Sequence, residues 1–259
     1  ALVNREEVDE IGLNPAAMHA IWTLAGLAES DSAAAGEALT AACDSGFEHV
    51  SSPVRNAAIG FCREDQISQA IQAGLQNDVD AKVRLTLLLR VAEGNAKHAI
   101  DGDGLAALLP SIQADDVLLD AWTSAASTDP TSAIVAMTKM NQASTDAITQ
   151  RVSVLAEHLA RNRPTAEQIS QLLQSDPKSS LAVNVWQGLA NGWPRDLTIS
   201  LPEESQKRVR DRFLAEDTSV ESKAAILAVA DKWSVENLNK IVGEIQDELL
   251  TTAMDADAE

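Results

Sequence analysis

Two short segments of the chain begin in the same way, and each leads into an apolar stretch with helical spacing. The first is Ser-Pro-Val-Arg at residues 52–55, and the second is Asp-Ala-Lys-Val-Arg at residues 80–84. A helix start that recurs after a few tens of residues is typical of a helical repeat, in which each unit packs on its neighbours. We therefore expect a chain of stacked helices.

The rest of the sequence extends this pattern. Apolar residues recur at helical spacing nearly throughout, whereas the alternation typical of strands is almost absent. Six prolines stand where a helix can begin but not continue: Pro15, Pro53, Pro130, Pro164, Pro177 and Pro202. Asn14, Ser52, Asp129 and Asp176 directly precede four of them and are expected N-caps. The short connections favour antiparallel neighbours. The sequence predicts an all-α fold, a right-handed α-solenoid of about seven antiparallel helical hairpins.

We expect this solenoid to form a single domain over residues 1–252, followed by a flexible acidic tail at residues 253–259. Hydrophobic residues make up 45% of the chain but aromatic residues only 3%, so the core must consist mainly of Ala, Leu, Ile and Val. Small side chains of this kind suit closely packed helices. No apolar stretch approaches the length of a membrane span, so we expect no membrane insertion.

The charge of the chain argues against two classes of partner. The formal net charge is -19, and phosphate-rich partners require clustered Lys and Arg. Nucleic acids and anionic membrane surfaces are therefore poor candidates. The alternative explanation is that the acidity only keeps an exposed protein soluble.

The sequence offers little that could carry catalysis or bind a metal. Cys43 and Cys62 lie in apolar helical stretches and are expected to be buried free thiols, and no Cys-x-x-Cys is present. The four histidines are not spaced to place two ligands on one helical face. Asp101-Gly102-Asp103-Gly104 begins like a calcium loop, but the later ligands are missing, so a turn before a helix explains it better. We expect no catalytic residue, cofactor or metal.

Tryptophan supplies the best candidate for a binding residue. Trp22, Trp122 and Trp186 stand within apolar helical stretches and are expected to fill gaps between repeats. Trp193 and its neighbour Arg195 lie in a Gly-Trp-Pro-Arg loop, where an exposed Trp would be a typical interface anchor.

The alternative for this loop is burial. Pro194 and Leu197 stand close enough in sequence to cover the Trp193 indole. The sequence leaves the two alternatives open.

The two repeated segments resemble the start of the second helix of a HEAT repeat, through Pro-Val-Arg at residues 53–55 and Lys-Val-Arg at residues 82–84. More narrowly, residues 19–27, 80–89 and 186–194 resemble the HEAT segment of large extracytoplasmic proteins common in planctomycetes. In those proteins a sugar-dehydrogenase-like β-propeller precedes the repeats and a c-type haem domain often follows. The resemblance covers roughly residues 13–195.

This resemblance implies a structural role for two arginines. Arg55 and Arg84 stand at matching positions and would donate hydrogen bonds to carbonyls or to an acidic side chain of the adjacent unit. Asp80 and Asp115 are the candidate acceptors. The chain has neither a propeller-like strand pattern nor a Cys-x-x-Cys-His motif, so no dehydrogenase or haem residue carries over.

The sequence thus predicts a non-catalytic helical-repeat scaffold that binds another protein or a neighbouring domain of the same parent chain. The alternative is an accessory HEAT segment of a larger oxidoreductase, which shapes access for a substrate or an electron partner. A third hypothesis, a HEAT-fold glycosylase acting on DNA, conflicts with the net charge of -19. The resemblance implies an extracytoplasmic location, and the oligomeric state is not predicted.

Overall fold

The computed structural model describes residues 2–30, 32–93, 100–140 and 145–235, together with Leu238 and Gly243. These residues form thirteen α-helices and three short 3-10 helices, and none of them belongs to a strand. The prediction of an all-α fold is therefore confirmed.

Two compact units divide the chain: unit 1, Ala1–Asp129, and unit 2, Pro130–Glu259. Each is described by itself below. A single solenoid domain over residues 1–252 stays a prediction. The predicted acidic tail at residues 253–259 lies outside the described residues.

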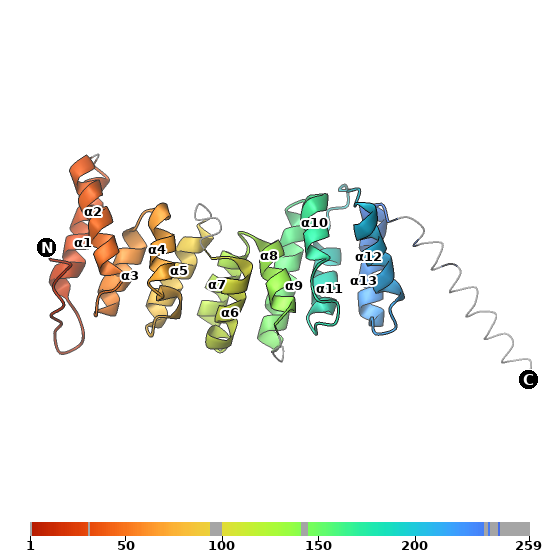
Figure 1. Ribbon diagram of the computed structural model, residues 1–259, viewed down its shortest axis with the longest axis horizontal. Coiled ribbons are helices and arrows are strands. Elements are labelled where there is room, and N and C mark those ends of the chain that lie inside the picture. Colours follow the sequence, from red (N-terminus) through yellow and green to blue (C-terminus); the bar gives the residue numbers. More distant parts are fainter. Residues whose placement is uncertain are drawn as a thin grey trace, which may run out of the picture. The chain divides into compact units, whose positions relative to one another are not determined.

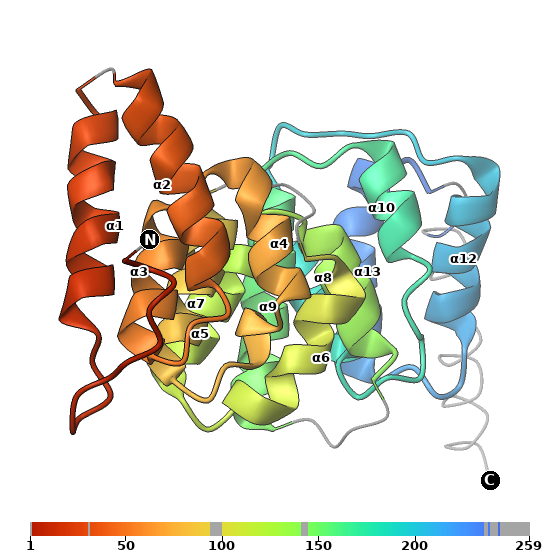
Figure 2. The same ribbon diagram turned by 60° about the vertical axis from the view of Figure 1, so that its left-hand side comes forward.

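Unit 1 contains seven of the described α-helices and two 3-10 helices. They are α1 (Pro15–Ala28), α2 (Ala33–Gly46), α3 (Ser52–Phe61), η1 (Glu64–Gln66), α4 (Ile67–Gln72), η2 (Leu75–Asn77), α5 (Ala81–Ala92), α6 (Gly102–Ile112) and α7 (Asp116–Ala126). Helices α1, α2 and α3 pack against one another, α3 packs against α5, and α5 packs against α7. Figure 1 and Figure 2 both show α1 beside α2.

Unit 2 contains the other six described α-helices and one 3-10 helix. They are α8 (Pro130–Thr138), α9 (Asp146–Arg161), α10 (Ala166–Leu172), α11 (Ala182–Gly192), α12 (Glu203–Leu214), α13 (Val220–Ala230) and η3 (Asp231–Trp233). Helix α8 packs against α9 and α10, while α11 lies between α9 and α13. In both units, alternate helices are therefore direct neighbours.

Helix starts follow capping chemistry, although not always at the predicted residue. Asn14 caps α1, its Oδ1 accepting the Ala17 N–H at 2.9 Å, and Pro15 occupies the first turn as expected. Helix α3 begins at Ser52 rather than after it, so Ser52 does not cap that helix. Pro177 was expected at a helix start, but it lies in a turn, and α11 begins at Ala182.

Small residues allow two helices of unit 2 to approach closely. A Cβ atom added to Gly188 of α11 would lie 2.5 Å from the backbone oxygen of Ser153 and 2.7 Å from the Cβ of Ala156 in α9. A Cβ on Gly192 would collide with the backbone of Glu157. The backbones of α9 and α11 are thus nearly in contact at two successive turns.

Candidate functional site

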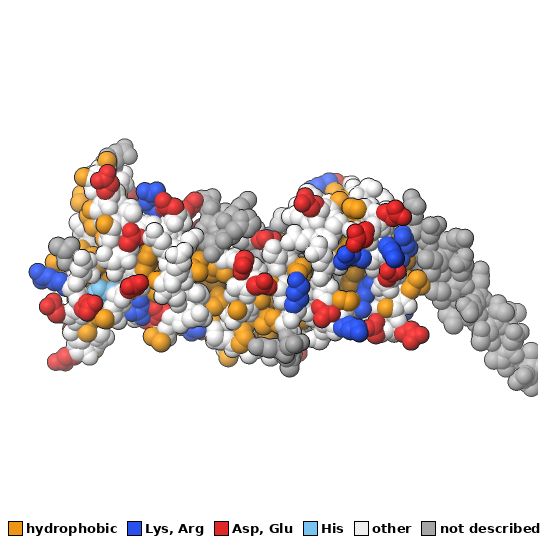
Figure 3. Space-filling view, viewed as in Figure 1, with side chains coloured by type: hydrophobic (Ala, Val, Ile, Leu, Met, Phe, Trp, Pro, Cys, Tyr) orange, Lys and Arg blue, Asp and Glu red, His pale blue; other side chains and the backbone are white. Residues whose placement is uncertain are grey.

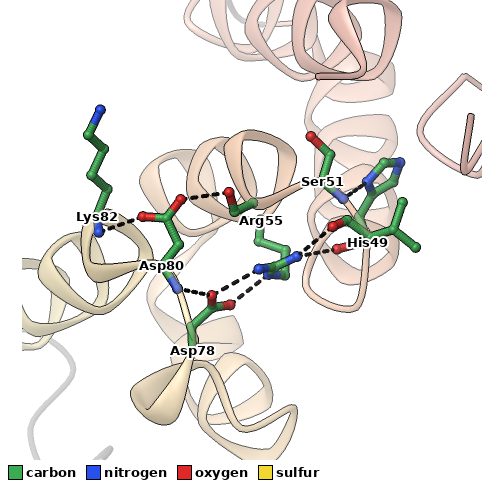
Figure 4. Close-up of polar contacts among 8 residues, drawn as sticks. His49, Ser51, Arg55, Asp78, Asp80 and Lys82 are labelled. Atoms are coloured by element: carbon green, nitrogen blue, oxygen red, sulfur yellow. Dashed lines mark hydrogen bonds and ion pairs between the residues drawn. The ribbon is translucent and has the colours of Figure 1, made fainter. Parts of the chain in front are cut away.

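A buried ion pair holds the start of α3 to the segment before α5 (Figure 4). Arg55 donates from Nε to Oδ2 of Asp78 at 2.6 Å and from Nη2 to Oδ1 at 2.9 Å. Its Nη1 donates to the carbonyl oxygens of His49, at 2.7 Å, and Val50, at 3.1 Å. A guanidinium forms strong bonds in this two-pronged geometry. Arg55 therefore joins three stretches of unit 1.

The surroundings of Asp78 favour its ionised form. The Arg55 and Asp78 side chains are only 13% and 4% exposed. Burial by itself raises the pKa of Asp78, but the hydrogen bonds from Arg55 and from the Asp80 N–H outweigh it, so the pKa lies below its ordinary value. Sequence reasoning missed Asp78. No local signal marks it, because the pairing depends on the course of the connection through η2.

Asp80 has a different partner from the one predicted. Its Oδ2 accepts the hydroxyl of Ser52 at 2.6 Å, and its Oδ1 accepts the Lys82 N–H at 2.9 Å (Figure 4). The Ser52 hydrogen bond and then the Lys82 hydrogen bond lower the pKa of Asp80. Asp80 is therefore the N-cap of α5 and ties that helix to the first residue of α3.

The second predicted brace does not repeat the first. The Nε of Arg84 is buried and has no hydrogen-bond partner among the described residues. Asp115 caps α7 instead, its Oδ1 accepting the N–H groups of Val117 at 3.0 Å and Leu118 at 3.1 Å. Arg55 and Arg84 thus match in sequence position but not in their bonds.

The structure places Trp193 in the interior of unit 2, as the alternative for its loop proposed. Trp193 is 9% exposed, and its indole N–H donates to the Leu197 carbonyl at 3.0 Å. Its ring lies edge-on to Trp233, with centroids 5.3 Å apart. Arg195 is exposed, and its carbonyl accepts a hydrogen bond from Lys232. The loop is therefore attached to η3 and offers a partner little of the Trp193 indole.

The other tryptophans divide between core and surface. Trp122 is fully buried, and its indole N–H donates to the Leu105 carbonyl at 2.8 Å. Trp186 is 8% exposed, as predicted. The prediction for Trp22 was wrong, because Trp22 is 47% exposed on α1. The His19 ring lies edge-on to the Trp22 ring, with the two ring centroids 5.6 Å apart. Helical periodicity placed Trp22 in an apolar stretch, but the described elements of unit 1 leave about half of the Trp22 side chain exposed.

The N-terminal segment, α1 and α2 enclose an open groove of about 770 Å³, which we call the α1–α2 groove. One of its lining residues, His19, contacts the Trp22 ring. None of the residues that line it is Asp, Glu, Lys or Arg. Lining side chains include Leu2, Ala16, His19, Leu24 and Ala38. Hydrophobic side chains are visible at this surface of unit 1 in Figure 3. The groove is an apolar surface on a strongly acidic chain.

A second hollow, of about 470 Å³, lies in unit 2 among the end of α10, α11 and α12, and we call it the unit 2 pocket. Its interior is apolar and includes Leu172, Val185, Trp186 and Leu189. Lys178, Arg208, Asp211, Arg212 and Asp217 also line it. The charged lining therefore has three cations and two carboxylates, although the chain as a whole has a charge of -19.

Arg212 is the most enclosed charge of the unit 2 pocket. Its side chain is 14% exposed, and its Nη1 lies 3.5 Å from Oδ1 of Asp217. The Nε of Arg212 is buried and has no hydrogen-bond partner among the described residues. Figure 3 shows further Lys and Arg side chains over α12, which carries Lys207, Arg208, Arg210 and Arg212.

The two cysteines are buried free thiols, as predicted. Burial raises the pKa of Cys43 to about 12 and, against an opposing effect of Arg90, raises that of Cys62 to about 11. Thiols in such surroundings are poor nucleophiles near neutral pH.

Within the described ranges, no three His, Cys, Asp or Glu side chains gather in a way that could hold a metal ion. None of the described helices has the length and apolar character needed to cross a membrane. No family model, curated protein or solved structure matches the chain significantly.

Proposed function

We propose that the chain is a non-catalytic helical-repeat scaffold that binds another protein, or a neighbouring domain of the same parent chain, through the α1–α2 groove and Trp22. Each unit would be a stretch of the right-handed α-solenoid of HEAT-like hairpins that the sequence predicts. The packing of alternate helices supports this, since α3, α5 and α7 follow one another in unit 1, as do α9, α11 and α13 in unit 2.

The observation that carries the proposal is the uncharged lining of the α1–α2 groove. Hairpins that end a helical-repeat array in water have a polar outer face. Here the α1–α2 groove has no charged lining residue, and Trp22 and Leu27 of α1 are about half exposed. Large apolar surface patches mark sites of interaction, and an exposed Trp is a frequent anchor of such sites. A protein surface that covers this groove would remove the exposed apolar area from water.

The test is site-specific photocrosslinking in the organism that makes the protein, with the complete reading frame. A photoreactive phenylalanine analogue at Trp22 should crosslink to one defined protein segment, and mass spectrometry would tell whether that segment belongs to another protein or to the same chain. The matched control places the analogue at Val79, which is 94% exposed in the same unit. Equal products at both positions, or none at Trp22, would contradict the proposal.

Purified components then give the affinity. Once the crosslinked segment is identified, Trp22→Ala should weaken its binding about tenfold or more, the effect of removing an interface anchor. Val79→Ala should leave binding unchanged. An unchanged affinity for Trp22→Ala would place the interface elsewhere.

A further inference from the structure

We propose that the unit 2 pocket binds a free aliphatic monocarboxylate, with its hydrocarbon chain against α10 and α11 and its carboxylate on Arg212. This goes beyond the proposed scaffold function and concerns another unit, so either proposal can fail alone. The volume of about 470 Å³ falls within the range of pockets that enclose small molecules. The size of the pocket therefore suits a small molecule.

The interior of the unit 2 pocket selects for hydrocarbon. Leu172, Val185 and Leu189 are at most 4% exposed, and they line it together with Trp186 and Ala215. A peptide would bring backbone N–H and C=O groups among these apolar side chains, where few partners exist for them. An aliphatic chain brings no such groups. The lining thus favours a small amphipathic molecule over a peptide segment.

Arg212 selects for the carboxylate. Its buried Nε lacks an acceptor among the described residues, and its Nη1 is 3.5 Å from Asp217, longer than an ordinary hydrogen bond. The position of Arg212 in the last turn of α12 lets its charge interact with the helix dipole, but this supplies no acceptor for Nε. A planar carboxylate binds two adjacent N–H groups of a guanidinium at once. A carboxylate in the pocket would therefore accept from the outer N–H groups of Arg212, which lines the pocket.

The rest of the lining carries charges of both signs. Lys178 and Arg208 add two cations to Arg212, against the carboxylates of Asp211 and Asp217. Arg208 also donates to Glu204, which is not part of the lining, at 2.8 Å. With Arg208 paired to Glu204, the remaining cations and carboxylates of the lining balance, so the preference for an anionic ligand comes from Arg212 itself.

The experiment uses the full chain, nitrogen-15 labelling of its five tryptophan indoles, and octanoate as the probe. NMR titration with octanoate should shift the Trp186 indole signal, assigned with Trp186→Phe, and leave Trp22 and Trp122 of unit 1 in place. Octanol has the same chain without the charge, and it should bind at least about tenfold more weakly. Equal binding of octanoate and octanol, or no shift of Trp186, would overturn the proposal.

Two arginines of α12 give a matched pair of variants. Arg212→Gln should weaken octanoate binding about tenfold or more, whereas Arg210→Gln removes the same charge from a residue outside the lining and should change it less than about twofold. Equal effects would show only general attraction of an anion and would overturn the assignment.

A third variant and a competing ligand complete the test. Ala215→Leu adds side-chain volume at the lining and keeps all charges, so it should also weaken octanoate binding, even if Arg212→Gln fails to fold. An unchanged affinity would contradict the site. A short peptide that ends in leucine and binds more tightly than octanoate would replace the free monocarboxylate with a peptide carboxylate and so overturn the proposal.

Discussion

Arg55 of α3 is joined to Asp78 by two parallel hydrogen bonds, of 2.6 Å and 2.9 Å, inside unit 1. The pair links two parts of the chain that are 23 residues apart, and both side chains are largely buried. Removing one partner leaves the other charge buried without compensation, which is much more costly than never having formed the pair.

We expect Arg55→Gln to lower the free energy of unfolding of unit 1 by about 3 kcal/mol. Arg63→Gln is the control, because Arg63 and Asp65 form an ion pair in which both side chains are about 65% exposed. This variant should change the free energy of unfolding by less than about 0.5 kcal/mol. Urea denaturation followed by circular dichroism measures both variants, and hydrogen exchange in α3 assigns the loss to unit 1. Equal effects would show that the buried pair contributes no more than a surface pair.

Acid should remove the contribution of this pair. The folded state holds the pKa of Asp78 below the ordinary value of 3.8, so the folded state binds a proton less readily than the unfolded state. The stabilisation is complete above the unfolded pKa and is lost as the pH falls through the lower folded pKa. Stability curves of the wild type and Asp78→Asn, measured by urea denaturation, should therefore converge as the pH falls below about 4. Curves that stay parallel would contradict the assignment.

Alkaline pH should destabilise the folded protein through its two buried thiols. Cys43 and Cys62 have pKa values raised from 9.0 to about 12 and about 11, so the folded state keeps their protons while the unfolded state releases them. Their contribution to stability is complete below pH 9 and is lost as the pH rises toward these values. A variant with alanine at both positions should lose less stability between pH 9 and pH 11 than the wild type.

The chain contains no tyrosine, which simplifies this alkaline measurement. Lysine is then the other side chain that titrates over the same interval, and it is unchanged in the variant. Thermal melts at a series of pH values give the comparison. If the melting temperature falls equally steeply with pH in the wild type and in the variant, the thiols ionise as easily in the folded state as in the unfolded state.

Two glycine substitutions should have opposite signs. Gly188→Ala places a methyl group 2.5 Å from a backbone oxygen of α9, and we expect a loss of about 2 kcal/mol or more. Gly36→Ala, in the interior of α2, meets nothing within 4 Å and should stabilise by about 0.5 to 1 kcal/mol. Chemical denaturation measures both. A stabilising Gly188→Ala would mean that α9 and α11 are further apart than described.

Capping and periodicity made the helices predictable, whereas contacts between distant residues were not. The cap at Asn14 and the helix that it begins were predicted from local sequence, whereas Asp80 was expected to accept from an arginine and caps α5 instead. The pairing of Arg55 with Asp78 depends on the course of the connection through η2, which local rules do not determine. Sequence spacing therefore identified the arginine but not its acceptor.

Exposure of aromatic residues was the least predictable property of the candidate sites. Periodicity assigns Trp22 to an apolar face, but it does not tell whether another helix covers that face. For Trp193, burial depends on Trp233, 40 residues later in the chain. Pocket-lining residues from α10, α11 and α12 likewise meet only after the helices of unit 2 have packed.

The near contact of α9 and α11 has a consequence for the unit 2 pocket. With Gly188 and Gly192 against the backbone of α9, sliding α11 along its axis would bring side chains where only hydrogen atoms fit. Val185, Trp186 and Leu189, on a neighbouring face of α11, thereby form a preorganised wall. Because the wall is in place before any ligand arrives, little conformational entropy remains to be lost on binding.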